Sequence, residues 1–72
     1  MWIKITTTDG AKHIVNESNL MDAYYSEESD LTIINFSRSA YPAIYVKGNI
    51  VPELTKVIGT KYSVATIMGK DG

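Results

Sequence analysis

The segment 37–42, Ser-Arg-Ser-Ala-Tyr-Pro, contains the residue types best suited to binding a ligand. Arg38 is the only arginine of the 72-residue chain, and hydroxyl groups flank it at Ser37 and Ser39. A guanidinium can donate a forked pair of hydrogen bonds to a phosphate, and the ring of Tyr41 can stack on a base or a peptide group. We therefore expect these four residues to form a binding loop for a phosphate- or nucleotide-bearing ligand. The alternative is a connecting loop whose arginine is solvated or pairs with a nearby carboxylate.

No arrangement of residues in the sequence supports catalysis or metal binding. The single histidine, His13, lies beside a predicted turn, and no spacing links it to Asp9 or to a nucleophile. A chain with one histidine and no cysteine does not supply a zinc site of Cys/His type. The glycine-rich and nucleophile motifs of common nucleotide-binding enzymes and hydrolases are absent. We therefore expect a protein that is not an enzyme and that has no metal and no cofactor.

Acidic residues gather around one predicted loop, and they are Asp22, Glu27, Glu28 and Asp30. A calcium loop needs ligands at fixed alternate positions and a glycine for its sharp turn. This segment has neither the spacing nor the glycine. We expect a solvated loop whose charges discourage strand pairing at the sheet edge.

The chain is rich in large aromatic residues, which are Trp2, Tyr24, Tyr25, Tyr41, Tyr45 and Tyr62. Strand alternation places Tyr24 and Tyr25 on opposite faces, so one of the two is expected to be exposed. Trp2 falls on the face opposite Ile3 and Ile5. Exposed aromatic side chains are typical anchors of protein interfaces, which makes Trp2 and Tyr24 candidate contact residues.

The size and net charge of the chain limit the classes of partner that it can bind. Seven basic residues face eight acidic ones, for a net charge of −1, whereas nucleic-acid-binding domains usually have a basic excess. We therefore do not expect a nucleic-acid partner; a third interpretation, a nucleic-acid binder, would use Lys4, Lys12 and Lys47 with Tyr45. No apolar run approaches the roughly 20 residues of a membrane helix, and no signal peptide is recognisable, so we expect a cytoplasmic protein without membrane contact.

A core of this size contributes only about 3–5 kcal/mol of net stability. Since the chain lacks cysteine and a metal site, oligomerisation is the remaining support for a small fold. We expect a homo-oligomer, most simply a dimer.

Short alternating segments predict a β-rich domain. The expected strands are 2–8, 12–16, 20–25, 31–36 and 43–47, and a sixth is possible over 62–68. Asp9-Gly10 predicts a type I′ hairpin turn, because both residues tolerate positive φ. Segment 31–36 is nearly continuous in apolar residues, so it should be central and covered on both faces, with Ile33 buried. For 18–23, a helical turn is the competing interpretation of the third strand.

One short helix is expected over 50–58. Leu54, Val57 and Ile58 form a single apolar stripe, Asn49 can cap the first turn, and Gly59 suits the left-handed position after the last turn. Residues 1–68 then make one small domain, and 69–72 a flexible tail.

The layout resembles the small flagellar FlbD-type proteins over residues 1–58. The matching pieces are Ile3-Lys4-Ile5-Thr6, Asp9-Gly10, Val15-Asn16, Thr32-Ile33, Tyr45-Val46-Lys47, Leu54 and Val57-Ile58. The longer loop before the fifth strand and the possible strand after the helix depart from that pattern. The chain also resembles short β-rich proteins of phage and mobile elements. Neither resemblance assigns a residue to a function.

These observations predict a mainly β or α+β fold. It would be a strongly bent antiparallel sheet or small open barrel of five or six strands, with one short C-terminal helix. The predicted function is a non-enzymatic module for protein–protein interaction or self-association, of bacterial or phage origin. The alternative is a module for a phosphate-bearing small ligand that uses the Arg38 loop.

Overall fold

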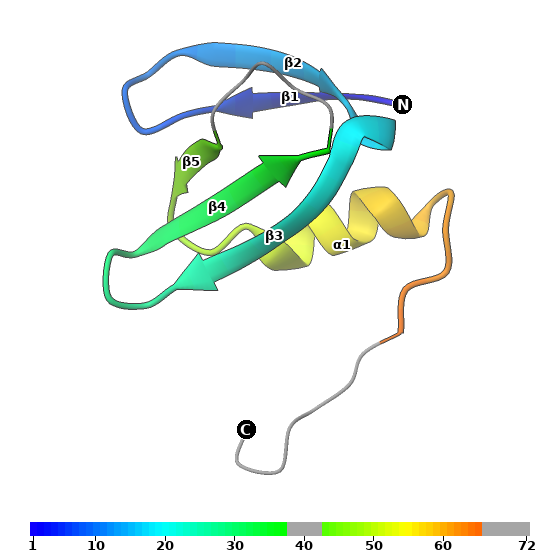
Figure 1. Cartoon of the computed structure of the whole chain (residues 1–72). Helices are drawn as coiled ribbons and strands as arrows, with labels where there is room; N and C mark the ends of the chain where they lie inside the picture. The colour runs from blue at the N-terminus through cyan, green and yellow to red at the C-terminus, as the bar shows by residue number, and fades with distance from the viewer. Residues whose placement is uncertain (38–42, 66–72) are drawn as a thin grey trace, which may run out of the picture.

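The fold is taken from a computed structural model, which describes residues 1–37 and 43–65. Within these ranges, five strands form two antiparallel sheets, and one short helix follows them (Figure 1). The expected mainly β or α+β class is therefore confirmed, with five strands. The two sheets are bent toward each other and do not close into a barrel.

Strands β1 (Trp2–Thr6) and β2 (Lys12–Asn16) form the first sheet, an antiparallel hairpin. The hairpin is confirmed, but the type I′ turn is wrong. That turn needs a positive φ at both central residues, and of Asp9 and Gly10 only Gly10 has one, of 85°. The Gly10 N–H donates to the Thr7 carbonyl at 3.0 Å, and the Thr7 N–H donates to the Ala11 carbonyl at 2.9 Å. Asp9 instead accepts hydrogen bonds from the Thr7 hydroxyl and the Ala11 N–H. This carboxylate closes a longer loop, so the first strand ends at Thr6 rather than at position 8.

The second sheet has the order β3-β4-β5, with β3 at Leu20–Ser26, β4 at Leu31–Phe36 and β5 at Ile44–Lys47. Its central strand is the one predicted to be central, and Ile33 is buried at 8% exposure. The expectation that both faces are covered is wrong for the outer face: among the described residues, Ile33 is flanked there by half-exposed Tyr24 and Tyr45, and the core packs on the other face. A single 3-10 turn, η1 (Glu17–Asn19), joins the two sheets, and β3 begins directly after it. The strand interpretation of this region is therefore confirmed over the helical one.

Helix α1 (Val51–Gly59) begins where the Asn49 side chain accepts a hydrogen bond from the Val51 N–H at 3.1 Å. The buried Thr32 hydroxyl holds the entry to the helix, because it donates to the Gly48 carbonyl at 2.7 Å and accepts from the Ile50 N–H at 3.0 Å. One strand side chain thus sets the position of the helix on the sheet.

The expected left-handed glycine after the helix is wrong. Gly59 is itself the last helical residue, and Thr60 follows in the right-handed region at φ −71°. The Thr60 hydroxyl donates to the Val57 carbonyl at 2.8 Å, and the Tyr62 N–H donates to the Ile58 carbonyl at 2.9 Å. These bonds satisfy carbonyls of the last turn without a left-handed residue.

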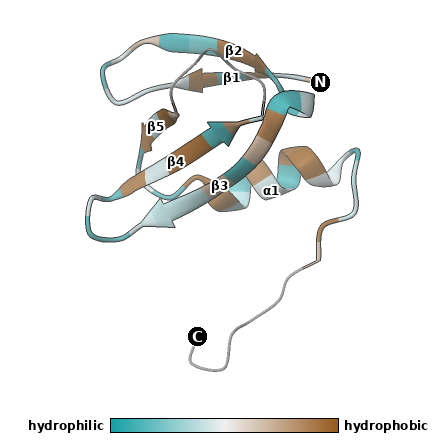
Figure 2. Ribbon diagram, in the orientation of Figure 1, coloured by the Kyte–Doolittle hydropathy of each residue, from teal (hydrophilic) through white to brown (hydrophobic). Residues whose placement is uncertain are grey.

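The core lies between the inner faces of the two sheets and helix α1. Its buried residues are Ile5, Val15, Ile34, Ile44, Val46 and Leu54. Figure 2 shows hydrophobic residues on β4, β5 and α1 and hydrophilic ones in the β3–β4 loop. A backbone hydrogen bond of 3.1 Å from Thr8 to the Tyr45 carbonyl ties the first hairpin loop to β5.

The predicted sixth strand is not found over 62–65, where the chain has no strand pairing. Its remainder, 66–68, and the predicted tail, 69–72, lie outside the described residues. Within the described ranges, no helix has the length and apolar character needed to cross a bilayer.

Candidate protein-interaction surfaces

The outer face of the three-stranded sheet has a row of large side chains across all three strands. Tyr24 of β3 pairs with Ile33 of β4, and Ile33 pairs with Tyr45 of β5. We call these three residues the outer row. Side chains directly opposite each other on neighbouring strands lie in contact, so the two tyrosines flank the isoleucine. Tyr24 is 54% exposed and Tyr45 46% exposed, whereas Ile33 is shielded between them.

Polar pairs border the outer row on both sides. On one side, the Asn35 amide donates to the Asp22 carboxylate at 2.6 Å. On the other, Lys47 forms an ion pair with Asp30 at 3.4 Å. An apolar centre with a polar border is the usual anatomy of a protein interface.

Tyr25, the neighbour of Tyr24, is turned to the other face and is partly buried, as the alternation predicts. Its hydroxyl donates to Asp30 at 2.6 Å. This hydrogen bond, more than the nearby Lys47 ammonium, lowers the pKa of Asp30, and it raises the pKa of Tyr25. The bond locks the β3–β4 loop, where Asp30 has a positive φ of 54°.

Trp2, the other predicted aromatic contact, is 68% exposed on the outer face of the hairpin. Ile14, also exposed, lies diagonally opposite Trp2 on β2. The inner faces of the two sheets pack on each other, so Trp2 and the outer row point in different directions. The structure therefore does not bring Trp2 and Tyr24 into one surface.

The Arg38 loop is described only at its first residue. Ser37 is exposed, and its N–H donates to the Asn19 carbonyl at 2.9 Å. Arg38, Ser39 and Tyr41 lie outside the described residues, so the phosphate-binding loop stays a prediction.

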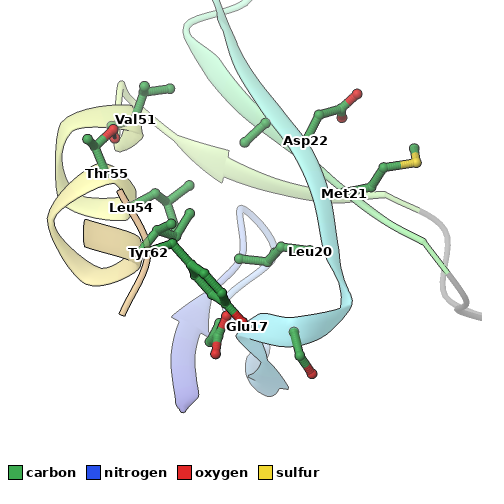
Figure 3. Close-up of a pocket in the computed structure, with 11 residues that line it drawn as sticks. Glu17, Leu20, Met21, Asp22, Val51, Leu54, Thr55 and Tyr62 are labelled. Carbon is green, nitrogen blue, oxygen red and sulfur yellow. Dashed lines mark hydrogen bonds between the residues drawn. The ribbon is translucent and has the colours of Figure 1, made fainter. Parts of the chain in front are cut away.

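A groove runs between strand β3 and helix α1, with a volume of about 400 Å³ (Figure 3). We call it the β3–α1 groove. Residues 20–23 of β3 line one wall, and Glu17, Ser18 and Tyr62 line one end. The helix contributes Val51, Leu54, Thr55 and Ile58 to the opposite wall. Sequence reasoning missed this groove, because its walls come from segments about thirty residues apart.

Glu17 supplies a buried carboxylate at the end of the groove, with its side chain 3% exposed. The Lys61 ammonium donates to it at 3.1 Å, and the amino group of Met1 lies 3.5 Å away. The hydrogen bond from Lys61 is the main reason that the pKa of Glu17 is lowered. The same bond is the main reason that the pKa of Lys61 is raised, and the neighbouring Tyr62 side chain raises it further. No local pattern links Glu17 and Lys61, which are 44 positions apart.

The remaining polar candidates come together only in part. Lys4 and Lys12 lie diagonally opposite each other on the outer face of the hairpin. Lys47 and Tyr45 lie on the other sheet, where Lys47 is paired with Asp30. His13 borders a shallow hollow that also touches Asp9 and Tyr45. Among the residues that the structure describes, no group of three His, Cys, Asp or Glu side chains is placed to hold a metal ion.

The described residues form a small α+β domain with exposed aromatic side chains on the outer faces of both sheets and, at Tyr62, at the end of the β3–α1 groove. Comparison of the chain with protein-family models, curated proteins and solved structures gives no match. The resemblance to FlbD-type and phage proteins therefore stays a prediction.

Proposed function

We propose that the protein is a non-enzymatic interaction module that associates with itself or with another protein through the outer row. The observation that supports this most directly is the pair of half-exposed tyrosines, Tyr24 and Tyr45, on either side of buried Ile33. Tyrosine has a large contact area and loses little side-chain entropy when it is fixed, which is why it is enriched at energetically dominant interface positions.

Rigidity supports the same proposal. The outer row belongs to three strands of one sheet, and a hydrogen bond on one border and an ion pair on the other limit its rearrangement. A preorganised surface loses little entropy on binding. The small size of the core is a second argument, since association would add stability that one core of this size does not supply.

The partner, the bacterial or phage origin and the cytoplasmic location are part of the proposal and depend on the sequence alone. We expect self-association as the simplest case, with a dimer as the first species.

Sedimentation at several micromolar concentrations tests the proposal. The wild-type chain should show concentration-dependent association. The double variant Tyr24→Ser, Tyr45→Ser should associate at least about tenfold more weakly, as expected for dominant interface tyrosines. Circular dichroism should show the same fold for both, because these side chains lie outside the core cluster.

Trp2→Ser is the matched control, since Trp2 is an exposed aromatic residue on the other sheet. Loss of association in this variant alone would assign the contact to the hairpin. Unchanged association in the tyrosine variant would contradict the outer row as the contact surface.

A further inference from the structure

The free edge of strand β3 forms one wall of the β3–α1 groove. Among residues 1–37 and 43–65, the sheet order is β3-β4-β5, so β3 pairs on one side only within these ranges. Figure 3 shows the side chain of Leu20 pointing into the groove and those of Met21 and Asp22 pointing away from it, so the main chain at positions 21 and 22 contributes to this wall. Unpaired N–H and C=O groups on a sheet edge are a template for one more strand.

The opposite wall is an apolar stripe of helix α1. Val51, Leu54 and Ile58 recur at helical spacing and line the groove together. A strand edge beside an apolar helix face suits β-augmentation, in which main-chain hydrogen bonds give affinity and side-chain pockets give specificity. The volume, about 400 Å³, falls in the range of roughly 300–1,000 Å³ that is typical of binding pockets.

We propose that this groove takes up residues 63–68 of a second copy of the chain as an added strand. This segment, Ser-Val-Ala-Thr-Ile-Met, has no charge, proline or glycine, and β-branched residues occupy 64, 66 and 67. Positions 66–68 lie outside the described ranges, and their sequence is what supports their part in the pairing. At about 3.3 Å per residue, the four β3 residues of the groove wall span roughly 10 Å, so six residues are long enough to cover it.

A second copy fits this segment better than the same chain does. Tyr62 lies at the Glu17 end of the groove, and Ser63, Val64 and Ala65 are exposed and lead away from it (Figure 1). The chain therefore leaves its own groove at the point where a strand along β3 would have to begin. The groove is separate from the outer row, so this contact goes beyond the proposed function above.

A pair of neighbouring helix positions tests the groove. Thr55 and Lys56 are both exposed, but only Thr55 lines the groove. In the Tyr24→Ser, Tyr45→Ser background, which removes the outer-row contact, Thr55→Trp should fill the groove and weaken the remaining self-association about tenfold or more, whereas Lys56→Trp should leave it unchanged. For the incoming segment, Ile67→Pro removes a main-chain donor and should have the same effect as Thr55→Trp, with Asp71→Pro as its control.

Mixing the two defective chains makes the test specific. Thr55→Trp keeps an intact segment 63–68, and Ile67→Pro keeps an intact groove. Neither should associate with itself through this contact, but together they should form a mixed dimer with one added strand, detectable by native mass spectrometry. The tyrosine variant of the outer row should leave this mixed dimer intact, so the two proposals can fail separately.

Three results would overturn the inference. The first is association that neither Thr55→Trp nor Ile67→Pro changes. The second is a monomeric wild-type chain together with a shift of the NMR amide signals of residues 20–23 on Ile67→Pro substitution, which would show that the segment binds its own groove. The third is a monomer in which Ile67→Pro leaves those signals unchanged.

Discussion

Two adjacent isoleucines of the central strand provide the sharpest test of the fold. Ile34 is fully buried in the core cluster, whereas Ile33 is 8% exposed and belongs to the outer row on the opposite face of the sheet. Replacing either by alanine removes about three carbon groups, worth about 0.8 kcal/mol each in transfer from water. The transfer loss is therefore about 2.4 kcal/mol at both positions, and the cost of the remaining cavity decides the difference.

The cavity costs should differ because the neighbours differ. Ile34 packs against Ile44, Val46 and Leu54, which the two sheets and the helix hold in place. Ile33 is flanked by two half-exposed tyrosines, which can relax into the space. We expect Ile34→Ala to cost about 4.5 kcal/mol and Ile33→Ala about 2.5 kcal/mol, within the measured range of about 2–5 kcal/mol for such substitutions. At about 4–8 °C per kcal/mol, the two melting temperatures should differ by roughly 8–16 °C.

Urea unfolding followed by circular dichroism measures the two costs at a low protein concentration, where association contributes least. Because Ile34→Ala removes most of the stability expected for so small a domain, Ile34→Val provides a milder variant with an expected cost of about 0.5–1.5 kcal/mol. Equal costs at the two positions would refute the reasoning, because they would mean that the outer face is packed as tightly as the inner one.

Three further variants test other contacts. The pKa of Glu17 lies below its ordinary value of 4.5, so its ionised form should stabilise the fold above pH 4.5, and this stabilisation should be lost as the pH falls through the lowered pKa. The urea midpoints of the wild type and Glu17→Gln should therefore converge in acid. Parallel pH profiles of the two proteins would contradict the pairing with Lys61. Thr32→Val removes the buried hydroxyl that holds the start of the helix and should cost about 1–3 kcal/mol in urea unfolding, and a cost near zero would remove that role. Arg38→Ala should change stability by less than about 0.5 kcal/mol while weakening binding of the natural partner or ligand by about 2–5 kcal/mol in calorimetry, and unchanged affinity would reduce its loop to a connector.

Elements that depend on near neighbours in the chain could be predicted from the sequence. Alternation identified the five strands, and the nearly continuous apolar run identified β4 as the central one. The stripe that begins at Leu54 identified the helix, and the alternation of Tyr24 and Tyr25 identified which face each side chain takes. These signals work because a strand repeats every two residues and a helix every 3.6 residues, so a short window of sequence contains the pattern.

Choices among local alternatives were harder to predict. A residue type permits several backbone conformations, and hydrogen bonds from neighbouring side chains select among them. The Asp9 carboxylate selected a longer hairpin loop than Asp-Gly suggests, and the Thr60 hydroxyl allowed the helix to extend through Gly59. Both outcomes depend on side-chain geometry that dipeptide preferences do not contain.

By itself, the sequence determined that this is a small β-rich domain with one amphipathic helix and with some of its aromatic residues exposed on the surface. The tertiary structure decided which surfaces those residues form: it separated Trp2 from Tyr24, placed Tyr24 and Tyr45 on either side of Ile33, and paired Glu17 with Lys61 across 44 positions. Alternation states which residues share a face, but only the packing of sheets and helix determines which face is covered, which edge stays free and which distant charges meet.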